Sequence, residues 1–147
     1  MRTTALLVAL VVAASLCGCS SVKPVAIRTG DRCESCNRPI VDVKIAAEIA
    51  SPAGSLPLKF RTVSCAARYL HEHGQVPGEV FVTDYDSGRL IMARTAVFVK
   101  GVIDENTKEQ SYFAFGDVKS ALAFAKQHGG STADWPGIRQ QVAAGAN

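Results

Sequence analysis

Hydrophobic and polar residues alternate along several short segments of the chain, and this period of two predicts β-strands. The first segment covers residues 41–49 and the second residues 56–60, with the turn-forming sequence SPAGS between them. The sequence EVFVTDYDSGRLIMA predicts another hairpin, with its turn at DSG. Further strands are expected over residues 96–103 and 112–115. Hairpins should therefore supply much of the structure.

Other segments repeat their apolar residues every three or four positions, which predicts amphipathic helices. One helix begins near Val63 and is ended by Gly74. A second helix follows Asp117, which can cap its first turn, and ends at Gly129. A last short helix is expected over about residues 134–143, with a proline in its first turn.

The first two helices belong to an internal similarity. The sequences FRTVSCAARYLHEHG and FGDVKSALAFAKQHG match without gaps at an offset of 55 residues, from Phe60 and Phe115 onward. When the same offset is applied to the preceding residues, the predicted strand around Val41 aligns with the predicted strand around Ala96. We interpret the similarity as an internal repeat; chance likeness of two amphipathic helices is the alternative.

The repeat predicts the domain organisation. We expect an α+β fold in which two tandem β-β-α units share one core. The first unit covers about residues 31–74 and the second about residues 79–130, within one domain of residues 31–143. The length of the chain suits a single domain of this size.

The N-terminal sequence MRTTALLVALVVAASLCGCSS is typical of an exported lipoprotein. A basic residue precedes an apolar stretch shaped like the hydrophobic region of a signal peptide, and the following LCGC resembles a lipobox. We expect that residues 1–18 are removed, that Cys19 is lipidated, and that residues 19–30 tether the domain to a membrane. Ser20 favours the outer membrane, on its periplasmic side. An ordinary secretory signal is the alternative.

The composition excludes two classes of function. The charge is nearly balanced, with 16 basic and 13 acidic residues. The sequence has no basic run and no array of aromatic and basic residues, so nucleic-acid binding is not expected. It also has no set of nucleophile, histidine and acid that would indicate a hydrolase, and we do not expect an enzyme.

Three cysteines follow the predicted lipidation site: Cys33, Cys36 and Cys65. An odd number of thiols in an exported protein argues against a purely structural disulfide framework. At the offset of 55 residues, none of the three has a cysteine as its counterpart in the second unit. The chemistry should therefore lie in the first unit, whereas the residues common to both units serve the fold.

The cysteine spacing predicts a metal site. Cys33 and Cys36 can bring two thiolates to one ion from a tight turn, and Cys65 lies in a first helical turn, where free N–H groups favour a thiolate. The arrangement resembles a treble-clef knuckle. His71 and His73 lie too far along the helix to be natural fourth ligands. Three soft sulfurs suit Cu(I) better than Zn(II), although Zn(II) stays possible.

Two other interpretations of these cysteines stay open. Cys33 and Cys36 can close to a disulfide and serve thiol–disulfide exchange, although a strand rather than a helix is expected after them. Alternatively, the cysteines hold zinc or a disulfide that stabilises an interaction module.

The chain resembles the NosL family, accessory lipoproteins of nitrous oxide reductase maturation, over about residues 31–135. The similar stretches are the lipobox, CESC before an alternating strand, KFRTVSCAARYL, VTDYDSGRLIMARTAVFV and YFAFGDVKSALAFAKQHGG. The resemblance implies two β-β-α units, periplasmic Cu(I) binding and copper delivery to the reductase. We therefore expect a lipid-anchored Cu(I) chaperone for nitrous oxide reductase or a similar cuproenzyme.

The chain departs from the family pattern in its methionines. The family usually has Cys-Gly-Met where this chain has CNR, so Arg38 replaces a methionine. A second family methionine is replaced by Lys108 or Glu109, and the remaining Met92 is expected to pack in the core. Acidic residues of the family are also replaced, here by Arg61 and Thr62. An all-thiolate site should bind copper more tightly and release it less readily.

Overall fold

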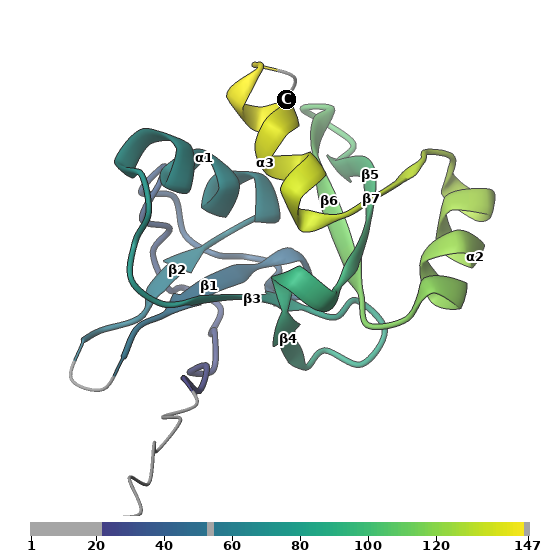
Figure 1. The fold of residues 1–147 in the computed structure, drawn as a ribbon. Coiled ribbons are helices and arrows are strands. Elements are labelled where there is room, and N and C mark those ends of the chain that lie inside the picture. The colour runs from purple at the N-terminus through teal and green to yellow at the C-terminus, as the bar shows by residue number, and fades with distance from the viewer. Residues whose placement is uncertain (1–21, 53–54, 146–147) are drawn as a thin grey trace, which may run out of the picture.

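Two antiparallel β-sheets and three α-helices form the part of the chain that the computed structural model describes, which is residues 22–52 and 55–145 (Figure 1). The strands are β1 (Ala47–Ala50), β2 (Leu58–Phe60), β3 (Glu79–Thr83), β4 (Leu90–Met92), β5 (Val97–Asp104), β6 (Glu109–Phe115) and β7 (Thr132–Ala133). The helices are α1 (Val63–His73), α2 (Val118–His128) and α3 (Trp135–Ala143), and the 3₁₀ turns are η1 (Val43–Ile45) and η2 (Ala93–Thr95). Within these residues, no helix has the length and apolar character needed to cross a bilayer.

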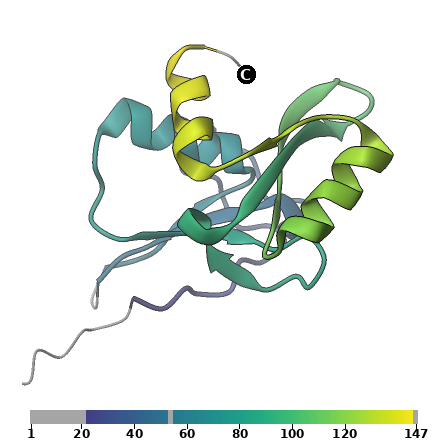
Figure 2. The ribbon, with the colours of Figure 1, turned by 45° about the vertical axis from the view of Figure 1, so that its right-hand side comes forward.

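The helices cover the sheets on different faces. The first sheet has the strand order β2–β1–β3–β4 and the second has the order β6–β5–β7. Helix α1 packs on β1 and β2 and also contacts β6 and α3, whereas α2 packs on the second sheet from the other side (Figures 1 and 2). Alternate residues of the second sheet therefore face two environments, with Phe98 and Tyr112 on the α1 side and Val99 and Phe113 beneath α2.

The larger hydrophobic cluster joins residues from both predicted units. Phe60 from the first unit and Phe98 and Tyr112 from the second are buried in it, together with Trp135 of α3. The predicted shared core is therefore confirmed for α1 and the two sheets. Helix α2 packs over a smaller second cluster around Phe113.

The three predicted helices are confirmed, and so is the predicted cap Asp117. Asp117 caps α2, because its carboxylate accepts the N–H groups of Lys119 at 2.8 Å and of Ser120 at 3.2 Å. Asp134 caps α3 by accepting the N–H of Gly137 at 2.9 Å. Both caps satisfy N–H groups that a helix leaves free at its start.

The first predicted strand is wrong in its N-terminal half. Residues 41–49 were expected to be extended, but β1 begins only at Ala47. The carboxylate of Asp42 accepts the N–H of Lys44 at 2.9 Å and so caps the 3₁₀ turn η1 in place of a strand. The other predicted strands correspond to β2, β3, β4, β5 and β6, and the two-residue strand β7, which pairs with β5, was not predicted.

This shift also corrects the predicted offset before the hairpins. Ala46 closes η1 and Ala96 closes η2, each by donating its N–H to the carbonyl three residues earlier. In the structure Ala46, and not Val41, has the position after a 3₁₀ turn that Ala96 has, so the predicted match of Val41 with Ala96 is wrong. The registers place five more residues in the β5–β6 hairpin than in the β1–β2 hairpin, so the offset of 55 holds only after the hairpin loop.

The sheets also divide the chain differently from the predicted units. β3 and β4 pair within the first sheet, although the second unit was placed from about residue 79. The change of sheet therefore falls after Met92 rather than before Glu79.

Part of the predicted tether is fixed to the domain. Val25 donates its N–H to the carboxylate of Glu48 at 2.8 Å, and Lys59 Nζ donates to the carbonyl of Ala26 at 3.1 Å. The predicted signal peptide and the lipidation site Cys19 lie outside the described residues.

Candidate metal centre

A tight turn before the first sheet carries two of the three cysteines. Cys33 donates its N–H to the carbonyl of Arg38 at 3.0 Å, and its own carbonyl accepts the N–H of Asn37 at 2.8 Å. Asn37 has a φ of +56°, a left-handed conformation that asparagine tolerates better than most residues. Glu34 donates its N–H to the carbonyl of Lys59 at 2.9 Å, which fixes the turn to β2. The turn is therefore anchored beside the strand that leads into α1.

The third cysteine is positioned by the start of α1. Thr62 is the N-cap residue, and its hydroxyl accepts the N–H of Cys65 at 3.1 Å. The next contact ties this helix to the second sheet, because Ser111 Oγ of β6 accepts the N–H of Ser64 at 3.2 Å and lies 3.0 Å from the hydroxyl of Ser64. Both contacts are buried, so the position of Cys65 is set by the core.

The structure brings together all three predicted ligands. The Sγ atoms of Cys33, Cys36 and Cys65 all lie within 4.8 Å of one another. Cys33 and Cys65 are buried, Cys36 is half-buried, and all three are free cysteines. With metal–sulfur distances of about 2.3 Å, three sulfurs around one ion in a plane would lie about 4.0 Å apart. The triad therefore fits a three-coordinate ion with small movements of the side chains.

The two buried thiols share a proton unequally. The hydrogen bond from Cys65 lowers the pKa of Cys33, and backbone N–H groups of Arg61, Cys36 and Ser35 act in the same direction, against the effect of burial. The same hydrogen bond and burial raise the pKa of Cys65. Cys33 is therefore the thiolate of this pair, and it is ready to act as a soft ligand.

The nearby histidines are not in the cluster. His73 lies at the exposed end of α1, where its ring stacks on Tyr69 at a centroid distance of 4.0 Å and its Nδ1 lies 3.0 Å from the Tyr69 carbonyl. His71 is also exposed. Within the described ranges, the group of close potential ligands containing the triad has no histidine, aspartate or glutamate.

The remaining methionine is also distant from the cysteines in the fold. Met92 ends β4, which is separated from β2 by two strands of the first sheet. It is half-buried and outside both hydrophobic clusters, and its Sδ accepts a hydrogen bond from Arg94 at 3.0 Å. The predicted core packing of Met92 is therefore wrong, and this methionine contributes nothing to the triad.

A small pocket of about 270 Å³ opens over Cys36 and Cys65. Its other lining residues are Arg38, Thr62, Ser64, Arg68, Lys108, Glu109 and Gln110. The lining thus includes Arg38, Thr62, Lys108 and Glu109, which the family resemblance singled out in the sequence, but not Arg61. The sequence indicated these residues one at a time, through that resemblance. It did not predict that they lie together.

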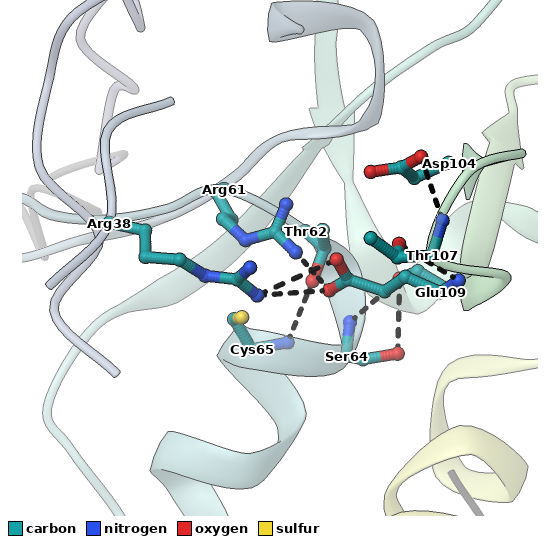
Figure 3. Close-up of polar contacts among 9 residues, drawn as sticks. Arg38, Arg61, Thr62, Ser64, Cys65, Asp104, Thr107 and Glu109 are labelled. Carbon is teal, nitrogen blue, oxygen red and sulfur yellow. Dashed lines mark hydrogen bonds and ion pairs between the residues drawn. The ribbon is translucent and has the colours of Figure 1, made fainter. Parts of the chain in front are cut away.

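Glu109 holds two arginines beside the thiols (Figure 3). Its carboxylate forms an ion pair with Arg61, and Arg38 Nη2 lies 3.3 Å from Glu109 Oε1. The β5–β6 loop sets the place of Glu109, because Thr107 Oγ1 accepts the N–H of Glu109 at 3.4 Å and Asp104 accepts the N–H of Thr107 at 3.2 Å. The knuckle turn, the start of α1 and the β5–β6 loop therefore meet above the cysteines.

Arg61 stays charged in this setting. Burial lowers the pKa of its guanidinium, but Glu109 and the nearby thiols of Cys65 and Cys36 outweigh burial and raise the pKa above its ordinary value. The Nε of Arg61 is buried without a hydrogen-bond partner among the described residues. The cation is thus held against the sulfurs by charge rather than by a full set of hydrogen bonds.

Comparisons with known proteins agree with this fold. A family model, NosL, matches residues 24–143. The fold is similar to the crystal structure of the copper chaperone NosL from Shewanella denitrificans, with a TM-score of 0.65 and 22% sequence identity, over 79% of this chain and 95% of that one. No curated protein matches the chain. The chain belongs to the NosL family.

Proposed function

We propose that this protein binds Cu(I) through Cys33, Cys36 and Cys65 and handles copper outside the cytoplasm. The proposal depends on one observation, the convergence of three free thiols within 4.8 Å. It is supported by membership of the NosL family and by the likeness to a protein described as a copper chaperone.

The chemistry of the triad favours Cu(I) over harder ions. Thiolates are soft ligands and select soft ions such as Cu(I). Zn(II) in closed structural sites takes four ligands, and the triad offers three. Cys33 and Cys65 are buried and would hold the ion, while the more exposed Cys36 lines the pocket through which copper can be exchanged.

The role we propose is binding and transfer rather than catalysis. The cargo would be passed to an apo-cuproenzyme, with nitrous oxide reductase as the candidate client. A lipid on Cys19 would hold the domain at the membrane on its periplasmic side, with the outer membrane favoured by Ser20. These parts of the proposal come from the sequence and the family, and the pocket over Cys36 provides a route for transfer.

Metal titration of the reduced full-length chain, purified anaerobically, tests the binding proposal. We expect one Cu(I) per chain in competition with a chelator of known affinity. Cys33→Ser should weaken binding by at least about tenfold, because it removes a thiol of lowered pKa and one of three ligands. Circular dichroism of each variant controls for folding. Unchanged affinity in a triple Cys→Ser variant would refute the proposal.

A second candidate function is thiol–disulfide exchange. The lowered pKa of Cys33 and its closeness to the Sγ atoms of Cys36 and Cys65 favour it. The same preparation distinguishes the two, because a disulfide formed in a glutathione buffer of periplasmic potential would abolish Cu(I) binding. Thiols that stay reduced in that buffer would exclude the redox function.

A further inference from the structure

Positive charge surrounds the pocket over the thiols. Arg38, Arg68 and Lys108 line it, and Arg61 lies behind Glu109 close enough to interact with the charges of the cysteines. We call these four residues the cationic wall. Among the described residues that line the pocket, Glu109 is the one carboxylate, and Glu105 pairs with Lys108 at 2.6 Å. Asp104 is a third carboxylate near the wall, since the N–H groups of Thr107 and Asn106 lower its pKa and the charge of Arg61 adds to this. The wall thus carries four positive charges against three negative ones.

The metal ions that a trithiolate site can hold differ in the charge of the complex. Three thiolates with a monovalent ion carry a net charge of −2, and with a divalent ion they carry −1. A nearby positive charge stabilises the dianion more than the monoanion, in proportion to that one unit of difference. The comparison is independent of how many protons the empty site binds, because both ions enter the same empty site.

We propose that the cationic wall makes the thiol triad selective for a monovalent over a divalent metal ion. This inference rests on the proposed function and extends it to the choice of cargo. The four residues of the wall are not ligands of the ion in this proposal. They supply the charge that complements a copper(I) trithiolate, and the same charge opposes Zn(II).

The geometry of the wall supports an electrostatic effect. The side chain of Arg61 is only 16% exposed, so its charge is poorly screened by water near Cys36 and Cys65. Glu109 fixes the guanidinium groups of Arg38 and Arg61 at one edge of the pocket. Arg38 is 60% exposed, so it can be replaced without opening the core.

The ratio of Cu(I) to Zn(II) affinity of the full-length chain tests the inference. Arg38→Gln should lower this ratio on the order of three- to tenfold, as expected for removing one partly exposed charge near the ion. Arg38→Lys should retain most of the ratio, since it keeps the charge and changes only the contact of Nη2 with the Glu109 carboxylate. Arg94→Gln is the matched control, because Arg94 is also 60% exposed and pairs with Glu79 away from the pocket.

A second variant should move the ratio in the opposite direction. Glu109→Gln removes a negative charge from the pocket, so the affinity ratio of Cu(I) to Zn(II) should rise. If Arg38→Gln weakens Cu(I) and Zn(II) binding equally, the residue has a structural role and the inference is overturned. The inference is also overturned if Arg38→Lys lowers the affinity ratio as much as Arg38→Gln does. Absence of Cu(I) binding in the wild type would overturn the proposed function as well, whereas Cu(I) binding with unchanged ratios refutes this inference alone.

Discussion

One residue of the first sheet is an acid whose side chain is buried in the core. Glu48 lies on β1 and is fully buried, yet one of its carboxylate oxygens has no partner among the described residues. The other oxygen accepts the N–H of Val25 at 2.8 Å. Burial raises the pKa of this carboxyl, and the Val25 contact only partly opposes it. Glu48 therefore fixes the N-terminal segment at a cost in stability.

Glu48→Gln should stabilise the protein at neutral pH and less so in acid. Because the pKa of Glu48 is raised in the folded state, its protonation contributes fully to the stability of the wild type below the pKa of the unfolded state. This contribution to the free energy of unfolding is lost as the pH rises through the pKa of the folded state. Glutamine keeps an acceptor for Val25 and carries no charge. Urea unfolding at about pH 3.5 and about pH 7.5 measures the difference.

A constant difference at both pH values would contradict this account of Glu48. Glu72→Gln serves as the control, because Glu72 is exposed on α1 and takes no part in the buried contact with Val25.

At the scale of elements, helix caps separate stability from metal binding. Helices α1 and α2 are equal in length, and each is capped by a side chain, Thr62 in α1 and Asp117 in α2. The Thr62 cap accepts the N–H of Cys65, whereas the Asp117 cap accepts N–H groups at positions that carry no thiol. The same local contact therefore has two different consequences.

Thr62→Ala and Asp117→Ala should each lower the free energy of unfolding by about 1 kcal/mol, the usual effect of losing an N-cap. Only Thr62→Ala should also weaken Cu(I) binding, because it frees the first turn of α1 around Cys65. Chemical denaturation and chelator competition measure the two effects. Equal losses of Cu(I) affinity in both variants would show that the cap acts only through global stability.

The elements were mostly predictable from local sequence, and the failures have local causes. The apolar spacing defines the helices well, and the cap Asp117 marks the start of α2. The start of β1 was misplaced because the Asp42 side chain competes with the strand for the backbone of Lys44. Strand β7 has two residues, and its pairing with β5 depends on tertiary contact that no local pattern records.

For the whole molecule, the site is an assembly of segments far apart in sequence. The three cysteines were predictable as ligands because thiols are few and their spacing is informative. The meeting of Arg38 and Arg61 with Glu109 was not, since these contacts span 71 and 48 residues and join the knuckle and α1 to a loop of the second sheet. That convergence depends on how the sheets pack around the core containing Phe60 and Tyr112.

The metal-free protein should be folded, and Cu(I) should add stability to it. The larger cluster contains Cys33 and Cys65, but its other members are aromatic and aliphatic side chains from both sheets and the helices, so we expect folding not to require the ion. Free Cu(I) at about 1,000 times its dissociation constant should raise the free energy of unfolding by about 4 kcal/mol. Anaerobic chemical denaturation with and without Cu(I) measures this gain.

The triple Cys→Ser variant should keep the fold and lose the gain from Cu(I). Unfolding of the wild type upon removal of metal would instead favour the zinc-stabilised interaction module, because the binding energy would then be folding energy.

The contact between Val25 and Glu48 limits how far the domain could lie from a lipid-anchored N-terminus. For a chain lipidated at Cys19, only the six residues before Val25 would serve as a free tether, because Val25 and Ala26 are bound to the first sheet. Six extended residues span at most about 21 Å, roughly two helix diameters. The domain would then lie close to the bilayer, and a client enzyme would receive copper from it at the membrane surface.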